Sequence, residues 1–223
     1  MRSKSNRVRR SWLLPAAILG TSAFLPSPAA VPAPLPAVAA DTGRIRLVVA
    51  SEGNEARYRV REQLASIDFP SDAVGSTSGI QGELVLEADG RVVRDSSRIV
   101  IDLASLTTDS DRRDNYVRRN TLETETNPAA VFVPTELQGL TFPLPAMGDL
   151  TFRMVGDLTI KGVTRPTTWD VTAHVMNGTV SGEAKTSFTF ADFELTKPRV
   201  RSVLTVNDDI RLEYTFRLVP VAE

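Results

Sequence analysis

Few residues in this 223-residue chain could carry out covalent or metal chemistry. The chain has no cysteine, which excludes a thiolate nucleophile, a disulfide framework and a cysteine metal site. His174 is the one histidine, so a zinc or iron site built on several histidines is excluded, whereas an all-carboxylate calcium or magnesium site is not. A charged turn adequately explains the adjacent carboxylates of Asp208 and Asp209. No usual nucleophile–base pair is present, so we expect no enzymatic activity. We also expect no bound metal and no cofactor.

Alternation of apolar and polar residues with period two is the pattern that must position these side chains. In residues 150–161, and again in residues 210–218, apolar side chains alternate with charged or hydroxyl-bearing ones. Successive side chains of a β-strand point to opposite faces, so each run has one apolar and one polar face. Several such strands in a row predict an all-β protein whose antiparallel sheet is closed or folded on itself.

The pattern predicts about eight or nine strands with one or two short helices. A turn at Ala88-Asp89-Gly90 separates strands at 80–87 and 97–103, which indicates a hairpin. Residues 68–79 are rich in Pro, Ser, Asp and Gly and are predicted to form a loop. Ser110 suits a helix N-cap, so a short helix is predicted over residues 110–120. The other predicted strands are 43–50, 56–62, 130–137, 150–161, 167–175, 179–190 and 204–219, with an interruption near 207–209.

The interior of the predicted barrel decides the function, and several inward positions are small. An eight-stranded barrel is just wide enough to be filled by side chains or to hold one small ligand, and small inward residues favour the ligand. The alternative is a solid barrel in which the glycines mark bulges or corners. The inward, cavity-lining candidates are Phe152, Met154, Gly156, Leu158, Trp169, Val171, Ala173, Gly182, Ala184, Phe188, Phe190, Tyr214 and Phe216.

The same alternation predicts which side chains face water. His174 lies between Ala173 and Val175 on the polar face of its strand and is expected to be exposed and without a functional role. A slip of one residue in register would move every side chain of a strand to the opposite face, so this assignment is sharply testable. The side chains expected to be largely exposed are Arg153, Lys161, Glu183, Lys185, Arg211 and Arg217.

Residues 1–40 have the layout of a secretory signal peptide. A basic start precedes a mainly apolar stretch at residues 12–25, and small residues at 37–40 suit a cleavage site before Asp41. Residues 9–14 (RRSWLL) resemble a twin-arginine export signal. An ordinary Sec signal and an uncleaved anchor are the alternatives. We therefore expect an exported protein, in the periplasm, on the cell surface or secreted, whose single mature domain is residues 41–223.

The predicted barrel resembles the YceI-like family along nearly its whole length. Residues 156–166 (GDLTIKGVTRP) match the most recognisable string of that family, and Arg113-Asp114 match its Arg-Asp pair. The order and spacing of the motifs together are specific. The remaining matching stretches are residues 101–108 (IDLASLTT), Asn127-Pro128 with Val131-Phe132, and residues 191–193 (ADF).

The resemblance implies a lipocalin-like antiparallel barrel closed around a long apolar pocket. It also implies an amphiphilic ligand with an isoprenoid tail, such as a polyprenyl lipid or a quinone, and no catalysis. Arg113, Asp114 and Tyr116 are the rim or head-group candidates, although Arg113 and Asp114 are better explained by a salt bridge between the helix and the barrel rim. Many members have histidine where Tyr116 stands, and glycine where Glu194 stands. The typical head-group preference is therefore not carried over.

Two hypotheses about function follow from these observations. The first is an exported protein that binds an isoprenoid-type lipid in the barrel for transport, storage or sequestration. The second is a non-enzymatic interaction or structural module with a solid core. The net charge of −1 argues against a nucleic-acid partner, which would require a basic surface. An apolar lipid is the expected partner, and contact with a membrane would be transient.

Overall fold

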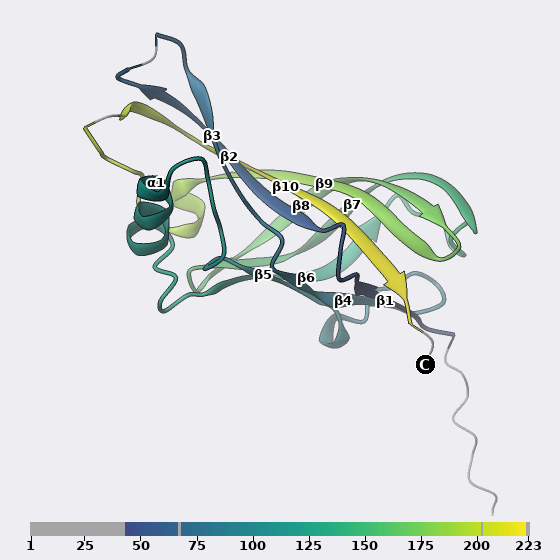
Figure 1. Ribbon diagram of the computed structural model, residues 1–223. Helices are drawn as coiled ribbons and strands as arrows, with labels where there is room; N and C mark the ends of the chain where they lie inside the picture. The colour runs from purple at the N-terminus through teal and green to yellow at the C-terminus, as the bar shows by residue number, and fades with distance from the viewer. Residues whose placement is uncertain (1–42, 67, 202, 222–223) are drawn as a thin grey trace, which may run out of the picture. The chain divides into compact units, whose positions relative to one another are not determined.

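Antiparallel strands make up most of the computed structural model, which describes residues 43–66, 68–201 and 203–221 (Figure 1). The predicted export signal at 1–40 lies outside the described residues. The strands are β1 (Ile45–Val49), β2 (Glu55–Leu64), β3 (Ser71–Thr77), β4 (Ile80–Leu86), β5 (Arg98–Asp102), β6 (Ala129–Gln138), β7 (Met147–Ile160), β8 (Val163–Met176), β9 (Thr179–Thr189) and β10 (Val203–Pro220). The helical segments are η1 (Arg94–Ser96), α1 (Asp111–Tyr116), η2 (Val117–Thr121) and η3 (Phe190–Phe193).

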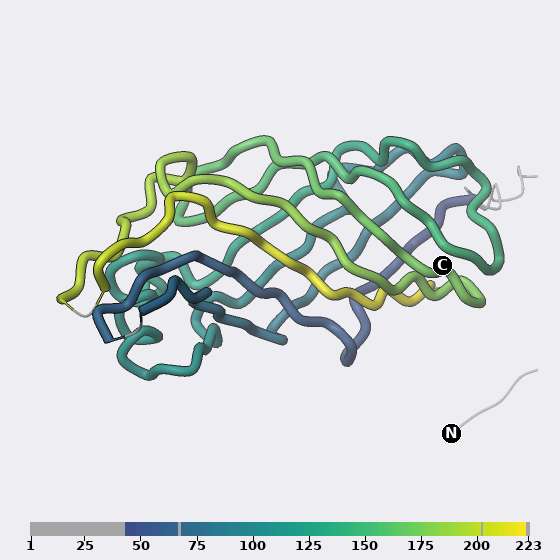
Figure 2. The backbone as a smooth tube through the Cα atoms, turned by 90° about the horizontal axis from the view of Figure 1, so that it is seen from above, coloured from purple at the N-terminus to yellow at the C-terminus, as the bar shows by residue number. Residues whose placement is uncertain are grey.

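Eight of the strands form a closed ring in the order β1-β4-β5-β6-β7-β8-β9-β10. The ring closes because β1 pairs with β4 on one side and with β10 on the other. The closing contact is short and joins Leu47, Val48 and Val49 to the last three residues of β10. Seen from above, the strands cross the barrel obliquely (Figure 2). The predicted all-β antiparallel barrel with a short helix is confirmed.

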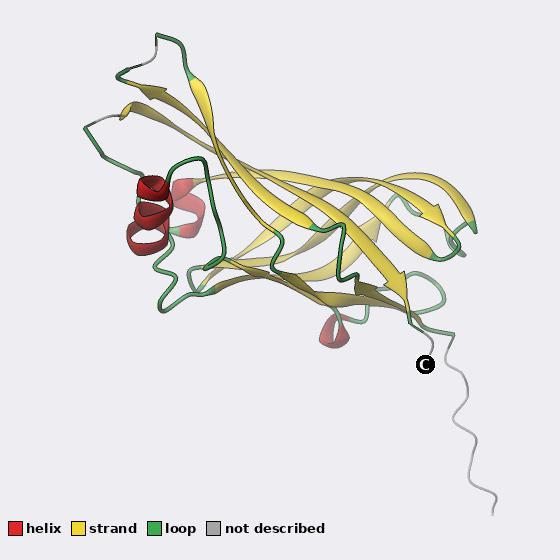
Figure 3. Cartoon of the chain, viewed as in Figure 1, coloured by secondary structure: helices red, strands yellow, loops and turns green. Residues whose placement is uncertain are grey.

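The long strand β10 has two partners along one edge. Its earlier part pairs with β2, from Val203 opposite Leu64 to Thr215 opposite Glu55, and its last residues pair with β1. β2 and β3 therefore diverge from the ring. The segment that contains Thr107 and α1 lies beside them. Ser76 and Thr107 exchange backbone hydrogen bonds of 2.9 and 3.0 Å, and helix α1 follows at the same end of the barrel (Figure 3). This arrangement makes one end of the barrel wider.

The prediction of a loop over residues 68–79 is wrong, because Ser71–Thr77 form strand β3. Its inward residues, Ala73, Gly75 and Thr77, are buried, and the intervening positions are less so. Gly75 pairs with Tyr58, and a Cβ atom at Gly75 would lie 2.3 Å from the Tyr58 ring. The strand needs small residues to accommodate that ring. The same small residues resemble a turn when the sequence is read alone.

The other elements agree with the predicted ones, with small differences. The hairpin of β4 and β5 forms, although the segment between them contains η1. The helix at residue 110 forms and continues as the π-helical turn η2, but the Ser110 side chain makes no capping hydrogen bond. The interruption near residues 207–209 appears as a register shift between Val206 and Ile210.

The predicted division of side chains between core and solvent is largely confirmed. Leu158, Trp169, Val171, Phe188 and Phe216 are buried, and Phe152 and Tyr214 are partly buried. The side chains predicted to face solvent are exposed with one exception: Arg153, Glu183, Lys185, Arg211 and Arg217.

Lys161 is the exception, since its side chain is only 18% exposed and Nζ lies 2.5 Å from Glu123 Oε1. Lys161 stands in the turn between β7 and β8 with a φ of 51°, so the alternation of the strand no longer applies to it.

Candidate functional site

A cavity of about 340 Å³ occupies the wider end of the barrel, between the strands and the α1–η2 segment. This volume lies within the range of small-molecule sites in proteins. Most of its lining is apolar. The strand residues that line it include Ala56, Tyr58, Val60, Leu64, Ala73, Ile99, Ile101, Ala130, Phe132, Met154, Leu158, Trp169, Ala184, Phe188, Ile210, Leu212 and Tyr214. The helices and loops contribute residues that include Leu103, Leu106, Tyr116, Val117, Leu122, Phe190, Leu195 and Pro198.

A second cavity, of about 60 Å³, lies further along the barrel interior. Leu47, Leu86, Leu150 and Leu218 are among its lining residues. Three residues line both cavities, namely Ile99, Met154 and Tyr214. These side chains form a partition between the two spaces, which we call the Met154–Tyr214 partition.

The Tyr214 side chain of the partition is also hydrogen-bonded to the loop between β1 and β2. Tyr214 Oη donates to Asn54 Oδ1 at 3.2 Å, and the same oxygen accepts from Arg217 N at 3.0 Å. Asn54 is buried and donates to Ala50 O at 2.8 Å. Burial raises the pKa of Tyr214, so its hydroxyl stays neutral and available as a donor.

The predicted lining residues fall into three groups. The first group lines the larger cavity and consists of Met154, Leu158, Trp169, Ala184, Phe188, Phe190 and Tyr214. The second group lines the smaller cavity and adds Phe152, Val171 and Phe216. The third group consists of Gly156, Ala173 and Gly182, which line neither of these two cavities.

The two glycines were predicted to line a cavity, with bulges or barrel corners as the alternative, and each of them lies in close contact with a neighbouring group. A Cβ atom at Gly182 would lie 2.1 Å from Thr172 O in the neighbouring strand β8. A Cβ atom at Gly156 would lie 2.5 Å from Val133 O and 2.6 Å from the Phe132 ring. Their missing side chains let neighbouring groups pack closely and leave no room for a ligand.

Among the rim candidates, Arg113 and Tyr116 line the larger cavity and Asp114 does not. Arg113 Nη2 lies 2.8 Å from Glu62 Oε1 on β2, and its Nη1 pairs with Asp109. Asp114 is buried and accepts hydrogen bonds from Thr108 N at 2.8 Å and Thr108 Oγ1 at 2.6 Å. The expected salt bridge between helix and barrel rim is therefore present, with Glu62 as the partner of Arg113.

Tyr58 and Glu62 line the cavity but were not among the predicted site residues. Both have the inward parity of β2, together with Val60 and Leu64, so the alternation in residues 56–64 could have identified them. The arginines at the intervening positions 57, 59 and 61 belong to the outer face and are the stronger local signal. The residues of β3 were missed with the strand itself.

Two polar atoms among the cavity residues have no hydrogen-bond partner in the described part of the chain. They are Tyr58 Oη and Trp169 Nε1, and both atoms are buried. Burial raises the pKa of Tyr58 to about 12, against the opposing effect of the Arg113 charge. The Tyr58 hydroxyl is therefore neutral at physiological pH.

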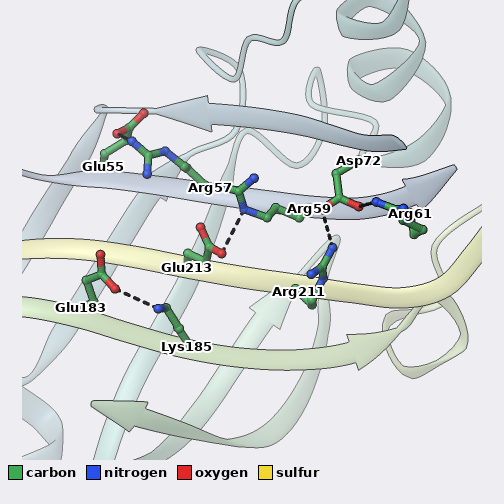
Figure 4. A network of polar contacts seen from close by, with 9 residues as sticks. All are labelled: Glu55, Arg57, Arg59, Arg61, Asp72, Glu183, Lys185, Arg211 and Glu213. Atoms are coloured by element: carbon green, nitrogen blue, oxygen red, sulfur yellow. Dashed lines mark hydrogen bonds and ion pairs between the residues drawn. The ribbon is translucent and has the colours of Figure 1, made fainter. Parts of the chain in front are cut away.

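Charged side chains on the outer face of β2, β3, β9 and β10 form a surface network (Figure 4). Arg59 Nε lies 2.9 Å from Glu213 Oε1, and Arg211 Nη2 lies 2.7 Å from Asp72 Oδ2. This network explains the arginines of β2 as the solvated side of the barrel. His174 is likewise on the outside, with Nδ1 2.8 Å from Asp149 Oδ1.

Two negative findings apply to the described residues. No group of three or more acidic or histidine side chains in residues 43–66, 68–201 and 203–221 is arranged to hold a metal ion. Among the same residues, no helix has the length and apolar character needed to cross a membrane.

A closed eight-stranded barrel around an apolar cavity defines the lipocalin-like class of β-barrels with interior sites. The family model of the YceI-like domain matches residues 50–218, and the chain belongs to that family. Among curated protein sequences, none gave a significant match.

Three solved structures share the fold. A polyisoprenoid binding domain from Saccharophagus degradans has 14% identity and a TM-score of 0.62, covering 79% of this chain and 98% of its own. BcnA from Burkholderia cenocepacia has 18% identity and a TM-score of 0.57, with 76% and 98% covered. The YCEI protein of Campylobacter jejuni has 16% identity and a TM-score of 0.52, with 72% and 91% covered.

Proposed function

We propose that this protein is an exported, non-enzymatic carrier that holds an amphiphilic isoprenoid-type lipid, such as a polyprenyl lipid or a quinone. The observation that carries the proposal is the cavity of about 340 Å³, lined mainly by apolar side chains inside a YceI-like barrel. Burying the lipid tail would supply affinity at about 25 cal/mol per Å² of apolar surface. The similar domain from Saccharophagus degradans is described as polyisoprenoid-binding, which supports the same ligand class here.

The alternative of a solid barrel acting as an interaction module fits the interior less well. A packed core would leave few voids larger than a water molecule. The space beside Trp169 and Ala184 is far larger than that. We therefore favour the carrier, whose role would be transport, storage or sequestration, with transient membrane contact when lipid is exchanged.

Native mass spectrometry of protein purified from its own host tests lipid binding. The expected result is an added apolar mass that solvent extraction releases and that returns when the lipid is added back. Protein unfolded, extracted and refolded without lipid is the matched control and should have only the mass of the chain. Repeated purification of unloaded protein that also takes up no isoprenoid lipid would refute the carrier.

N-terminal sequencing of protein from the host envelope or medium tests export. Basic residues, an apolar stretch and small residues precede Asp41, so the mature chain should begin near Asp41. Replacing Arg9 and Arg10 by lysine should block export if the twin-arginine route is used, and should have little effect on a Sec signal. Soluble cytoplasmic protein with an intact Met1 would contradict export.

A further inference from the structure

One end of the larger cavity carries charged side chains, whereas the rest is apolar. Glu62, Arg112 and Arg113 line the cavity beside α1, and we call this region the helix end. Arg57 and Glu213 also border the cavity, but their charges are paired with Glu55 and Arg59 in the outer network (Figure 4). An amphiphile would therefore place its polar head at the helix end and its tail among the apolar side chains.

Arg113 would ordinarily attract an anionic head group, because a guanidinium binds phosphate through paired hydrogen bonds. Here the guanidinium is already paired with the Glu62 carboxylate at 2.8 Å and with Asp109. The two carboxylates differ in environment. The Glu62 side chain is 7% exposed and that of Asp109 is 83% exposed. Water screens the charge of Asp109, whereas the charge of Glu62 acts inside the cavity.

Glu62 therefore determines the electrostatics of the helix end. A phosphate or diphosphate placed beside Arg113 would also lie close to the buried Glu62 carboxylate, where repulsion between like charges is strong. Arg112 is exposed, so its attraction for an anion is weakened by solvent. An uncharged oxygen at the helix end would not be repelled by Glu62 and would not depend on attraction by Arg112.

The helix end also offers a hydrogen-bond group suited to an uncharged head. Tyr58 lines the cavity, and its buried hydroxyl has no partner in the described part of the chain. A neutral hydroxyl can donate to a carbonyl or exchange a hydrogen bond with an alcohol.

Building on the proposed carrier function, we propose that Glu62 is a specificity-determining residue that makes the cavity select isoprenoid lipids with an uncharged polar head. The favoured ligands are then alcohols or quinones, and lipids with a phosphate or diphosphate head are disfavoured. Glu62 acts by neutralising Arg113 and by repelling an anion.

The experiment compares a polyprenol with the polyprenyl monophosphate of the same tail length, measuring Kd for both by titration. Wild-type protein should bind the alcohol more tightly. In Glu62→Gln, the repelling charge is gone and Arg113 is released, so the ratio of the two Kd values should shift toward the phosphate by about tenfold or more, equivalent to about 1.4 kcal/mol. The double variant Glu62→Gln with Arg113→Gln should lose that shift.

Asp72→Asn is the matched control. Asp72 lies on β3 next to β2 and pairs with Arg211 at 2.7 Å, but on the outer face, so the ratio should not change. Thermal melting checks that each variant is folded. Wild-type preference for the phosphate would overturn the inference without any variant, and so would an unchanged ratio in folded Glu62→Gln. If neither lipid binds wild-type protein, the carrier function itself fails, and this inference fails with it.

Discussion

At the scale of single residues, two neighbouring small positions on β9 have different reasons for being small. Gly182 and Ala184 both belong to the inward face of β9, and both were predicted to line a cavity. Ala184 is buried against the larger cavity, whereas Gly182 lies against the backbone of β8. Strand alternation shows only which way a position faces. Whether the space beyond it is open or filled depends on strands that are distant in sequence.

This difference leads to a prediction about paired substitutions. Ala184→Phe should extend into the cavity and lower lipid affinity at least about tenfold, with little change in stability because the space is open. Gly182→Ala should instead destabilise the fold, by about 1–3 kcal/mol, because its Cβ atom would collide with Thr172 O. A fluorescent-lipid binding assay and thermal melting measure the two effects. Wild-type lipid binding by folded Ala184→Phe would place the ligand outside the cavity.

The charged residues of the site show a second limit of sequence-based prediction. The motif match identified Arg113 and Asp114, and the expected salt bridge was correct in kind. Its partner Glu62 is far away in the chain and is brought near by the position of α1 over the cavity. The alternation in β2 contains Glu62 on an apolar face, which is the one local signal that points to it.

At the scale of elements, three strands divide the interior between them. β5, β7 and β10 supply Ile99, Met154 and Tyr214, respectively, to the partition. The partition would set the length of lipid tail that fits, since a longer tail must displace it to reach the smaller cavity.

A series at position 214 tests the partition. Tyr214→Leu should join the two cavities and shift preference toward lipids with longer tails, because it shortens a side chain that lines both. Tyr214→Phe is the control: it retains the ring, loses the hydrogen bond to Asn54, and should cost about 1 kcal/mol of stability without changing the preferred tail length. Titration with polyprenols of increasing length measures the preference. If wild-type protein, Tyr214→Leu and Tyr214→Phe all prefer the same polyprenol length, the partition does not determine the length of tail that binds.

Most elements were predictable from sequence because their alternation of apolar and polar residues is strong. Strand β3 is the exception. β3 is built from small and polar residues that pack beneath Tyr58, so its apolar signal is weak. The helix at α1 was predictable because the alternation stops there. The position of α1 over the cavity was not, since it depends on contacts with β2.

At the scale of the whole barrel, the sequence predicted a closed antiparallel sheet but not the strand that closes it. β1 and β2 divide one edge of β10 between them, so the chain passes from the ring to the diverging hairpin of β2 and β3. This division widens one end of the barrel and places the cavity there. No local pattern in β1 or β2 reports it, because both strands alternate in the same way.

The short contact that closes the ring also brings the two ends of the described barrel side by side, with Val221 N donating to Arg46 O at 3.0 Å. We therefore expect the barrel to form even when the chain begins and ends at a different point of the same ring of strands. A circular permutant that joins these ends through a short flexible linker, with new termini at the exposed Asn177-Gly178 turn, should fold and bind lipid as the parent does. A permutant opened between Glu213 and Tyr214 should not fold, because β10 pairs there with both β9 and β2. Circular dichroism and lipid titration compare the two, and equal stability of both permutants would show that the barrel does not need an unbroken β10.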